Sequence, residues 1–116
     1  YHLGRAIRRA VEDFEGDERV VVLGTGGMSH QLQAQRAGFI NVEFDTAFLD
    51  GLVRDPEAVA RIRHIEYLRE AGSEGIELVM WLVMRGALGD TVKEVYRATH
   101  VPTSNTHNGL LVLTDA

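Results

Sequence analysis

The sequence predicts a mixed α/β domain in which a small sheet is covered by packed helices. Apolar residues recur at three- and four-residue spacing in several segments, which is typical of helices with one buried face. A short apolar run at residues 20–23 leads into glycines, as a buried strand does before a tight loop. Two more segments near the end of the chain have the composition of strands, so we expect all three strands to share one sheet.

The first helices are expected where apolar periodicity coincides with capping signals. Residues 3–14 repeat apolar side chains with arginines and acids between them. A second helix carries its apolar face at residues 48–53, and Asp45 is placed to cap it. Asp55 and Pro56 then start a short third helix, because aspartate is a favoured cap and proline a favoured first helical residue.

Two further helical patterns follow in the middle of the chain. The first covers about residues 65–71 and stops at Gly72, since glycine readily ends a helix. Ser73 is placed to cap the second, which extends over about residues 74–87. These helices are expected to pack against the sheet.

The three strands are expected at residues 19–24, 92–101 and 110–113. Asn108 and Gly109 stand between the last two strands, and this dipeptide is a strong signal for a tight hairpin turn. The predicted sheet therefore joins a terminal hairpin to the strand at residues 19–24.

Composition limits the classes of protein that this chain can represent. Its 116 residues suit one domain, and a net charge of −5 spread along the chain argues against nucleic-acid binding. The absence of cysteine removes disulfides and thiolate metal sites and fits a reducing cytoplasm, where we expect the protein to be located. The apolar run at residues 78–84 is too short to span a bilayer, so no membrane association is expected.

Glu77 stands out because it lies within an otherwise apolar stretch, residues 76–84. A helix that is apolar on nearly every side is buried, and a carboxylate inside it must be paired, protonated or bound to a metal. A salt bridge to Arg85 or Arg69 is one interpretation, and a ligand or catalytic role is the other. Glu74, three residues earlier, would lie on the same face and could share a cation.

His30 follows a glycine-rich loop directly after the first predicted strand. Loops at the carboxyl ends of strands hold ligands in open α/β sheets, and histidine titrates near neutrality, which suits proton transfer. An ordinary hydrogen-bonded loop histidine is the alternative. The loop also begins a dinucleotide-binding fingerprint, but Ser29 occupies its third glycine position, which counts against that interpretation.

The remaining polar residues give weaker signals. No His-Glu-x-x-His motif is present, so the other histidines are expected to be structural or exposed: His2, His64, His100 and His107. Residues 103–106 read as a polar turn before the last strand, or as hydroxyl donors that line a pocket for an anionic ligand.

Three blocks of this sequence resemble the class III, LigB-type extradiol ring-cleavage dioxygenases, the family of protocatechuate 4,5-dioxygenase beta chains and gallate dioxygenases. They are GTGGMSHQL at residues 24–32, HIEYLREAGSEGIELVMW at residues 64–81 and SNT at residues 104–106. The similarity extends over nearly the whole chain. It implies that residues 1–116 are the carboxy-terminal part of a LigB-type catalytic domain whose amino-terminal half is missing.

The resemblance also implies roles for individual residues. His30 takes the place of the catalytic acid/base, Glu77 that of an Fe(II) ligand, and Ser104 that of a hydroxyl near the substrate carboxylate. The family binds iron through two histidines and one glutamate, and both histidines belong to the part that is absent here. We therefore expect residues 1–116 alone to be inactive.

The function implied is Fe(II)-dependent extradiol cleavage of protocatechuate, gallate or a related hydroxybenzoate with O2, in aromatic-compound catabolism. A small alpha subunit or a fused equivalent and a homo-oligomer are the implied partners. One alternative is a non-catalytic domain that keeps the fold and serves an assembly. The other is a nucleotide-binding α/β module, against which the broken glycine pattern counts.

Overall fold

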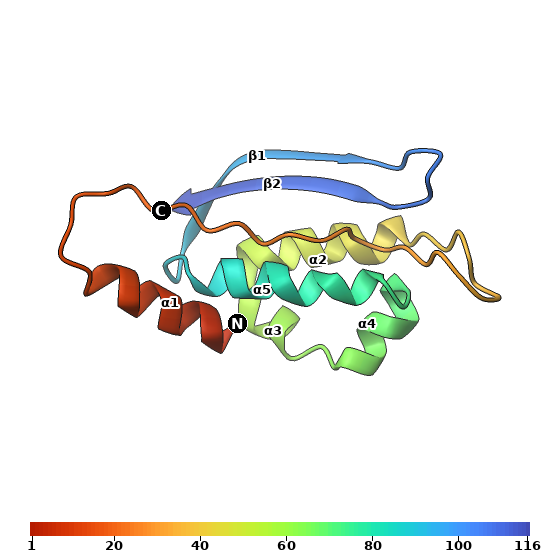
Figure 1. The fold of residues 1–116 in the computed structure, drawn as a ribbon, viewed down its shortest axis with the longest axis horizontal. Helices are drawn as coiled ribbons and strands as arrows, with labels where there is room; N and C mark the ends of the chain where they lie inside the picture. Colours follow the sequence, from red (N-terminus) through yellow and green to blue (C-terminus); the bar gives the residue numbers. More distant parts are fainter.

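The computed structural model describes all of residues 1–116 and combines helices with a two-stranded antiparallel sheet. Its elements are α1 (His2–Glu12), α2 (Val42–Arg54), α3 (Pro56–Ala60), α4 (His64–Ala71), the short 3-10 helix η1 (Gly75–Glu77), α5 (Leu78–Gly86), β1 (Val92–His100) and β2 (Asn108–Asp115). Figure 1 shows the hairpin as one layer over α2 and α5, with α1 at one end of the molecule. The mixed α/β class predicted from the sequence is confirmed.

The core lies among the apolar faces of α2, α3, α4 and α5, with Met28 of the glycine-rich loop inside it and Leu111 of β2 packed against it. Tyr67 is fully buried in it, and its hydroxyl donates to the carbonyl of Val59 at 3.0 Å. Phe48 packs edge-on against both Tyr67 and Trp81. The predicted apolar face of the second helix is thus largely buried. None of the helices has the length and apolar character that crossing a membrane requires.

Gly72 ends α4 as predicted, whereas the predicted amino-terminal caps agree with the structure in one case and differ in two. Asp55 caps α3 as predicted, since its side chain accepts from the Ala58 N–H at 3.0 Å. Asn41 caps α2 by accepting from Phe44 N at 3.0 Å, so the prediction of Asp45 as the cap is wrong. Asp45 lies inside the first turns of α2, where its buried carboxylate has other partners.

Ser73 does not cap the helix that follows it. The chain enters α5 through the tighter η1, and the Ser73 hydroxyl donates to the neighbouring Glu74 carboxylate instead of to a helix amide. The predicted helical segment at residues 74–87 is present, divided into η1 and α5.

The predicted strand at residues 19–24 is not a strand in this structure. No backbone group of residues 15–27 takes part in a backbone-to-backbone hydrogen bond, and the sheet contains β1 and β2 alone. The segment runs along β2 (Figure 1), but it is not hydrogen-bonded into the sheet. A strand requires backbone hydrogen bonds to a neighbouring strand, and an apolar composition alone does not provide that neighbour.

The hairpin turn is also longer than predicted. Asn108 and Gly109 belong to β2, where they pair with His100 and Thr99, and residues 101–107 form the connection. The reason lies outside the hairpin: the end of this connection is hydrogen-bonded to the glycine-rich loop, with His107 O accepting from Met28 N at 2.9 Å. A two-residue turn at 108–109 would remove these residues from that contact.

Candidate functional site

The candidate site forms where three loops meet around His30. The backbone N–H of His30 donates to Ala71 O at 2.8 Å, at the end of α4, and His30 forms an isolated bridge with Thr106 on its other side. Gly72 permits the close approach of α4, because its φ is +91° and a Cβ there would lie 2.3 Å from His30 O. His30 is therefore held between α4 and the 101–107 connection.

The carboxylate of Asp45, in α2, holds the loop that carries His30 in place. It is fully buried and accepts from the Ser29 N–H at 2.9 Å, from the Ser29 hydroxyl at 2.5 Å and from His107 Nδ1 at 2.6 Å. The Ser29 hydroxyl in turn accepts from Asn41 N at 2.7 Å. These hydrogen bonds offset the free-energy cost of burying the Asp45 carboxylate. They also join α2 to both loops of the site.

The orientation of the His30 ring follows from one hydrogen bond. Nδ1 lies 2.7 Å from the carbonyl oxygen of Met28. A carbonyl only accepts, so Nδ1 carries the proton and, in the neutral ring, Nε2 keeps its lone pair. The side chain is 8% exposed, and Nε2 lies 3.9 Å from Glu77 Oε2. His30 is thus a buried histidine whose basic nitrogen faces a carboxylate.

Glu77 lies at the end of η1 and not within a buried helix, so the prediction of a buried carboxylate is wrong. Its side chain is 50% exposed, and Oε2 accepts from the Gly27 N–H at 2.9 Å. Gly26 allows this approach, since its φ is +124° and a Cβ there would come within 2.6 Å of the Glu77 Cβ. Oε1 has no hydrogen-bond partner in the chain, which leaves it available to a ligand.

The salt bridge considered for Glu77 is absent. Arg85 is buried and donates to three backbone carbonyls, those of Leu52, Gly89 and Asp90, at 2.7 to 2.9 Å. Burial lowers the pKa of this guanidinium. Arg69 is exposed and forms no ion pair. The ionisable side chain nearest to the Glu77 carboxylate is instead that of His30, with Nε2 at 3.9 Å from Oε2.

The carboxylate of Glu74 accepts hydrogen bonds from nearby groups. Its Oε2 accepts from the Ser73 hydroxyl at 2.5 Å and from Leu32 N at 3.3 Å, and the bond from Ser73 is the main cause that lowers the pKa of Glu74. The chain contains no cluster of three His, Asp or Glu side chains suited to a metal ion. Around Glu77, which offers one carboxylate, residues 1–116 therefore form no three-ligand group of this kind.

The residue of the 101–107 connection that pairs with His30 is Thr106, two positions after Ser104. Ser104 is exposed in this connection, and its hydroxyl forms no hydrogen bond within the chain. Thr106 is the closer hydroxyl residue, because a Cβ on Gly27 would lie 2.8 Å from Thr106 Cγ2 and 3.0 Å from His30 Cε1. The polar residues 103–106 predicted that this loop contributes hydroxyl groups to a site. No local pattern in the sequence, however, distinguishes Thr106 from Ser104 as the residue next to His30.

The glycine-rich loop lacks the geometry of a dinucleotide site. Such a site places the phosphates at the amino terminus of a helix that begins directly after the glycines. Here the next helix is α2, which starts at Val42, and residues 31–40 contain turns. This agrees with the broken glycine pattern.

Comparison with known proteins adds the family context. The profile described as "Catalytic LigB subunit of aromatic ring-opening dioxygenase" matches residues 1–109. A gallate dioxygenase of Pseudomonas putida is 42% identical over 103 residues, which is 89% of this chain. The match covers 30% of that relative, so the chain spans less than a third of its length.

Removing the Asp45 carboxylate should destabilise the fold more than any exposed acid does. Asp45→Ala leaves the Ser29 N–H, the Ser29 hydroxyl and His107 without their acceptor, and we expect a loss of about 3–5 kcal/mol in the free energy of unfolding. Urea denaturation measures this free energy. Asp17→Ala, at an exposed position, is the control, and we expect it to change the free energy of unfolding by no more than about 0.5 kcal/mol. Equal effects of the two substitutions would contradict the role given to Asp45.

Proposed function

Because this chain belongs to the LigB family of catalytic subunits of aromatic ring-opening dioxygenases, we propose that it is the carboxy-terminal part of an iron(II)-dependent extradiol dioxygenase domain. The proposed substrate is gallate, protocatechuate or a related hydroxybenzoate. The observation that carries the proposal is the position of His30 Nε2, 3.9 Å from Glu77 Oε2. A basic nitrogen beside a partly exposed carboxylate suits a site with one proton carrier and one metal ligand.

Glu77 is the proposed iron ligand in this chain. Its Oε1 is free, its side chain is half exposed, and the Gly27 N–H holds the other oxygen in place. A 2-His-1-carboxylate site needs two histidines in addition, which we assign to the longer protein outside residues 1–116. Fe(II) held there would supply a Lewis acid for the substrate hydroxyl oxygens and the redox chemistry that O2 requires.

His30 is the proposed acid/base. Its Nδ1 proton is engaged by Met28 O, so Nε2 is the atom that accepts a proton from a substrate hydroxyl and later returns it. The buried position of the ring limits its rotation and keeps Nε2 directed towards Glu77. The proton is thus transferred at one defined atom beside the metal ligand.

The remaining assignments concern substrate and partners. We propose that the free hydroxyl of Ser104 donates to the substrate carboxylate, with Thr106 beside the ring of His30. A small alpha subunit or fused equivalent and further copies of the chain are the proposed partners, in the cytoplasm. Gallate is the first substrate to test, because the relative from Pseudomonas putida is a gallate dioxygenase.

Oxygen uptake by the longer protein, loaded with Fe(II) without air, tests the activity. On addition of gallate or protocatechuate we expect one O2 consumed per ring and cleavage beside the pair of hydroxyls. 4-Hydroxybenzoate is the control, since its single hydroxyl cannot chelate a metal and should give no uptake. Cleavage between the hydroxyls, or no uptake by protein with stoichiometric iron, would overturn the proposal.

Amide substitutions in the longer protein should separate the two roles. Glu77→Gln should lower iron content and activity together, because it removes the charged ligand while keeping an oxygen for Gly27 N. His30→Gln should retain iron, while turnover falls by roughly 10²- to 10⁴-fold, the range typical of general acid/base catalysis.

Glu74→Gln is the matched control for these variants. Its carboxylate bonds Ser73 and Leu32, so iron content should stay close to that of the unmodified protein. Iron per chain and ring-cleavage rate are measured for all three proteins. If His30→Gln loses iron as fully as Glu77→Gln, then His30 is a metal ligand. If only Glu74→Gln loses iron, then Glu74 is the ligand and the assignment of Glu77 is wrong.

A further inference from the structure

One peptide unit links the buried carboxylate of Asp45 to the ring of His30. The N–H of Ser29 donates to both carboxylate oxygens of Asp45, at 2.9 and 3.1 Å. The carbonyl of the same peptide unit belongs to Met28, and its oxygen accepts from His30 Nδ1 at 2.7 Å. A chain of hydrogen bonds therefore runs from the carboxylate through the backbone to the imidazole.

The geometry of the peptide bond gives this chain of hydrogen bonds a direction. A peptide unit is planar, and the protein contains no cis peptide bond, so the N–H and the C=O of the Met28–Ser29 unit point to opposite sides. Because Asp45 holds the N–H on one side, the carbonyl points away from Asp45, where it meets the ring of His30. Hydrogen bonds in series also polarise one another, so a charged acceptor at the N–H makes the carbonyl a better acceptor.

Asp45 is a fixed point for the peptide unit because the carboxylate has further partners of its own. It is fully buried, and its Oδ2 also accepts from the Ser29 hydroxyl at 2.5 Å and from His107 Nδ1 at 2.6 Å. The backbone of His107 donates to Ser29 O at 3.1 Å and accepts from Met28 N at 2.9 Å. Rotation of the peptide unit would break several of these bonds at once and leave buried polar groups unpaired.

The ring of His30 lies between two acceptors, and only one of them is compatible with the role proposed for the ring. Nδ1 lies 2.7 Å from Met28 O, whereas Nε2 lies 3.9 Å from Glu77 Oε2. A neutral imidazole has one N–H, so a proton on Nε2 would make that nitrogen a donor towards Glu77 and remove its lone pair. The oriented Met28 carbonyl favours the proton on Nδ1, which keeps Nε2 basic and leaves Glu77 free of this hydrogen bond.

We propose that Asp45 is a positioning residue for His30 and sets the tautomer and the direction of its ring through the Met28–Ser29 peptide unit. The proposal deepens the function proposed above and rests on it for the acid/base role of His30. It assigns to the site a second carboxylate, which acts from α2 through the backbone and requires no contact with metal or substrate.

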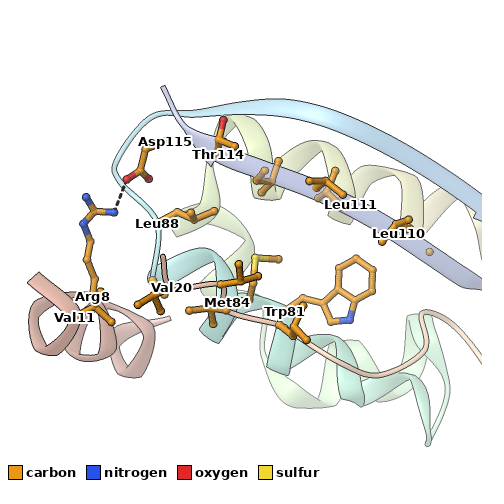
Figure 2. A pocket seen from close by; sticks show the side chains of 18 of the residues that line it. Arg8, Val11, Val20, Trp81, Met84, Leu88, Leu110, Leu111, Thr114 and Asp115 are labelled. Atoms are coloured by element: carbon orange, nitrogen blue, oxygen red, sulfur yellow. Dashed lines mark hydrogen bonds and ion pairs between the residues drawn. The ribbon is translucent and has the colours of Figure 1, made fainter. Parts of the chain in front are cut away.

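The rest of the loop is anchored by contacts that do not involve Asp45. Trp81 Nε1 donates to Gly26 O at 3.1 Å, and Figure 2 shows the Trp81 ring rising from α5 towards β2. The N–H of His30 donates to Ala71 O at 2.8 Å. A substitution that keeps the size of the Asp45 side chain should therefore disturb the peptide unit without releasing the loop.

Asp45→Asn is the substitution that tests the proposal most closely. The amide has the shape of the carboxylate, but one of the two oxygens that face the Ser29 N–H becomes an NH2 group, so two donors would face each other. Asp50→Asn is the matched control. It makes the same change in the same helix, where the Asp50 carboxylate pairs with Arg97 at 2.6 Å.

NMR of the ring nitrogens of His30, in the longer protein without iron or substrate, measures the tautomer. At about pH 9, where a histidine ring is neutral, we expect the proton on Nδ1 alone in the unmodified protein and in Asp50→Asn. In Asp45→Asn we expect the Nε2–H tautomer to appear. A proton on Nε2 in the unmodified protein would overturn the proposal, and so would an unchanged ring in Asp45→Asn. Because no turnover is involved, this result does not depend on whether the protein cleaves gallate.

Turnover by the longer protein loaded with Fe(II) gives a second measurement. Asp45→Asn should keep its iron and its KM for gallate, while kcat falls by roughly 10- to 100-fold, as expected when a catalytic group is misplaced. In a protein that already carries His30→Gln, the same substitution should lower kcat by no more than about twofold, because the residue that Asp45 positions is gone. Equal losses in the two backgrounds would show that Asp45 supports the fold alone and would contradict the proposal.

Discussion

Asp45 places a negative charge inside the protein, and the need to satisfy that charge determines how the loops of the candidate site are arranged. Its carboxylate is fully buried and has three donor groups, two from Ser29 and one from His107. Ser29 precedes His30 directly, and His107 ends the 101–107 connection. One carboxylate on α2 thus joins the two loops that enclose the site, and neither loop can move without leaving a buried polar group unpaired.

The position of Glu77 relative to His30 follows from backbone groups of the same loop. Met28 O fixes the tautomer and direction of the His30 ring, and Gly27 N holds one oxygen of Glu77. The two side chains therefore meet through contacts with residues 26–28, although they are 47 positions apart in the sequence. This explains why glycine is needed at Gly26, where a side chain would collide with Glu77.

Local patterns in the sequence predicted the features that depend on local interactions. Apolar periodicity located the helices, and Asp55 was identified as a cap because its partner is three residues away. Features with distant partners were missed: Asp45 was taken for a cap because its true partners, Ser29 and His107, lie 16 and 62 residues away. Asn108 and Gly109 predicted a tight turn for the same reason, since the contact that lengthens the connection is made outside the hairpin.

The pairing of His30 with Glu77 was expected from the resemblance to the LigB family, and neither residue type nor spacing would have established it. The most direct test of the account is a crystal structure of the longer protein with Fe(II) and gallate, prepared without oxygen. We predict that the Glu77 carboxylate coordinates the iron and that His30 Nε2 lies off the metal, within hydrogen-bonding distance of a substrate hydroxyl. Iron bound by His30, or a site in which Glu77 makes no contact with the metal, would contradict the account.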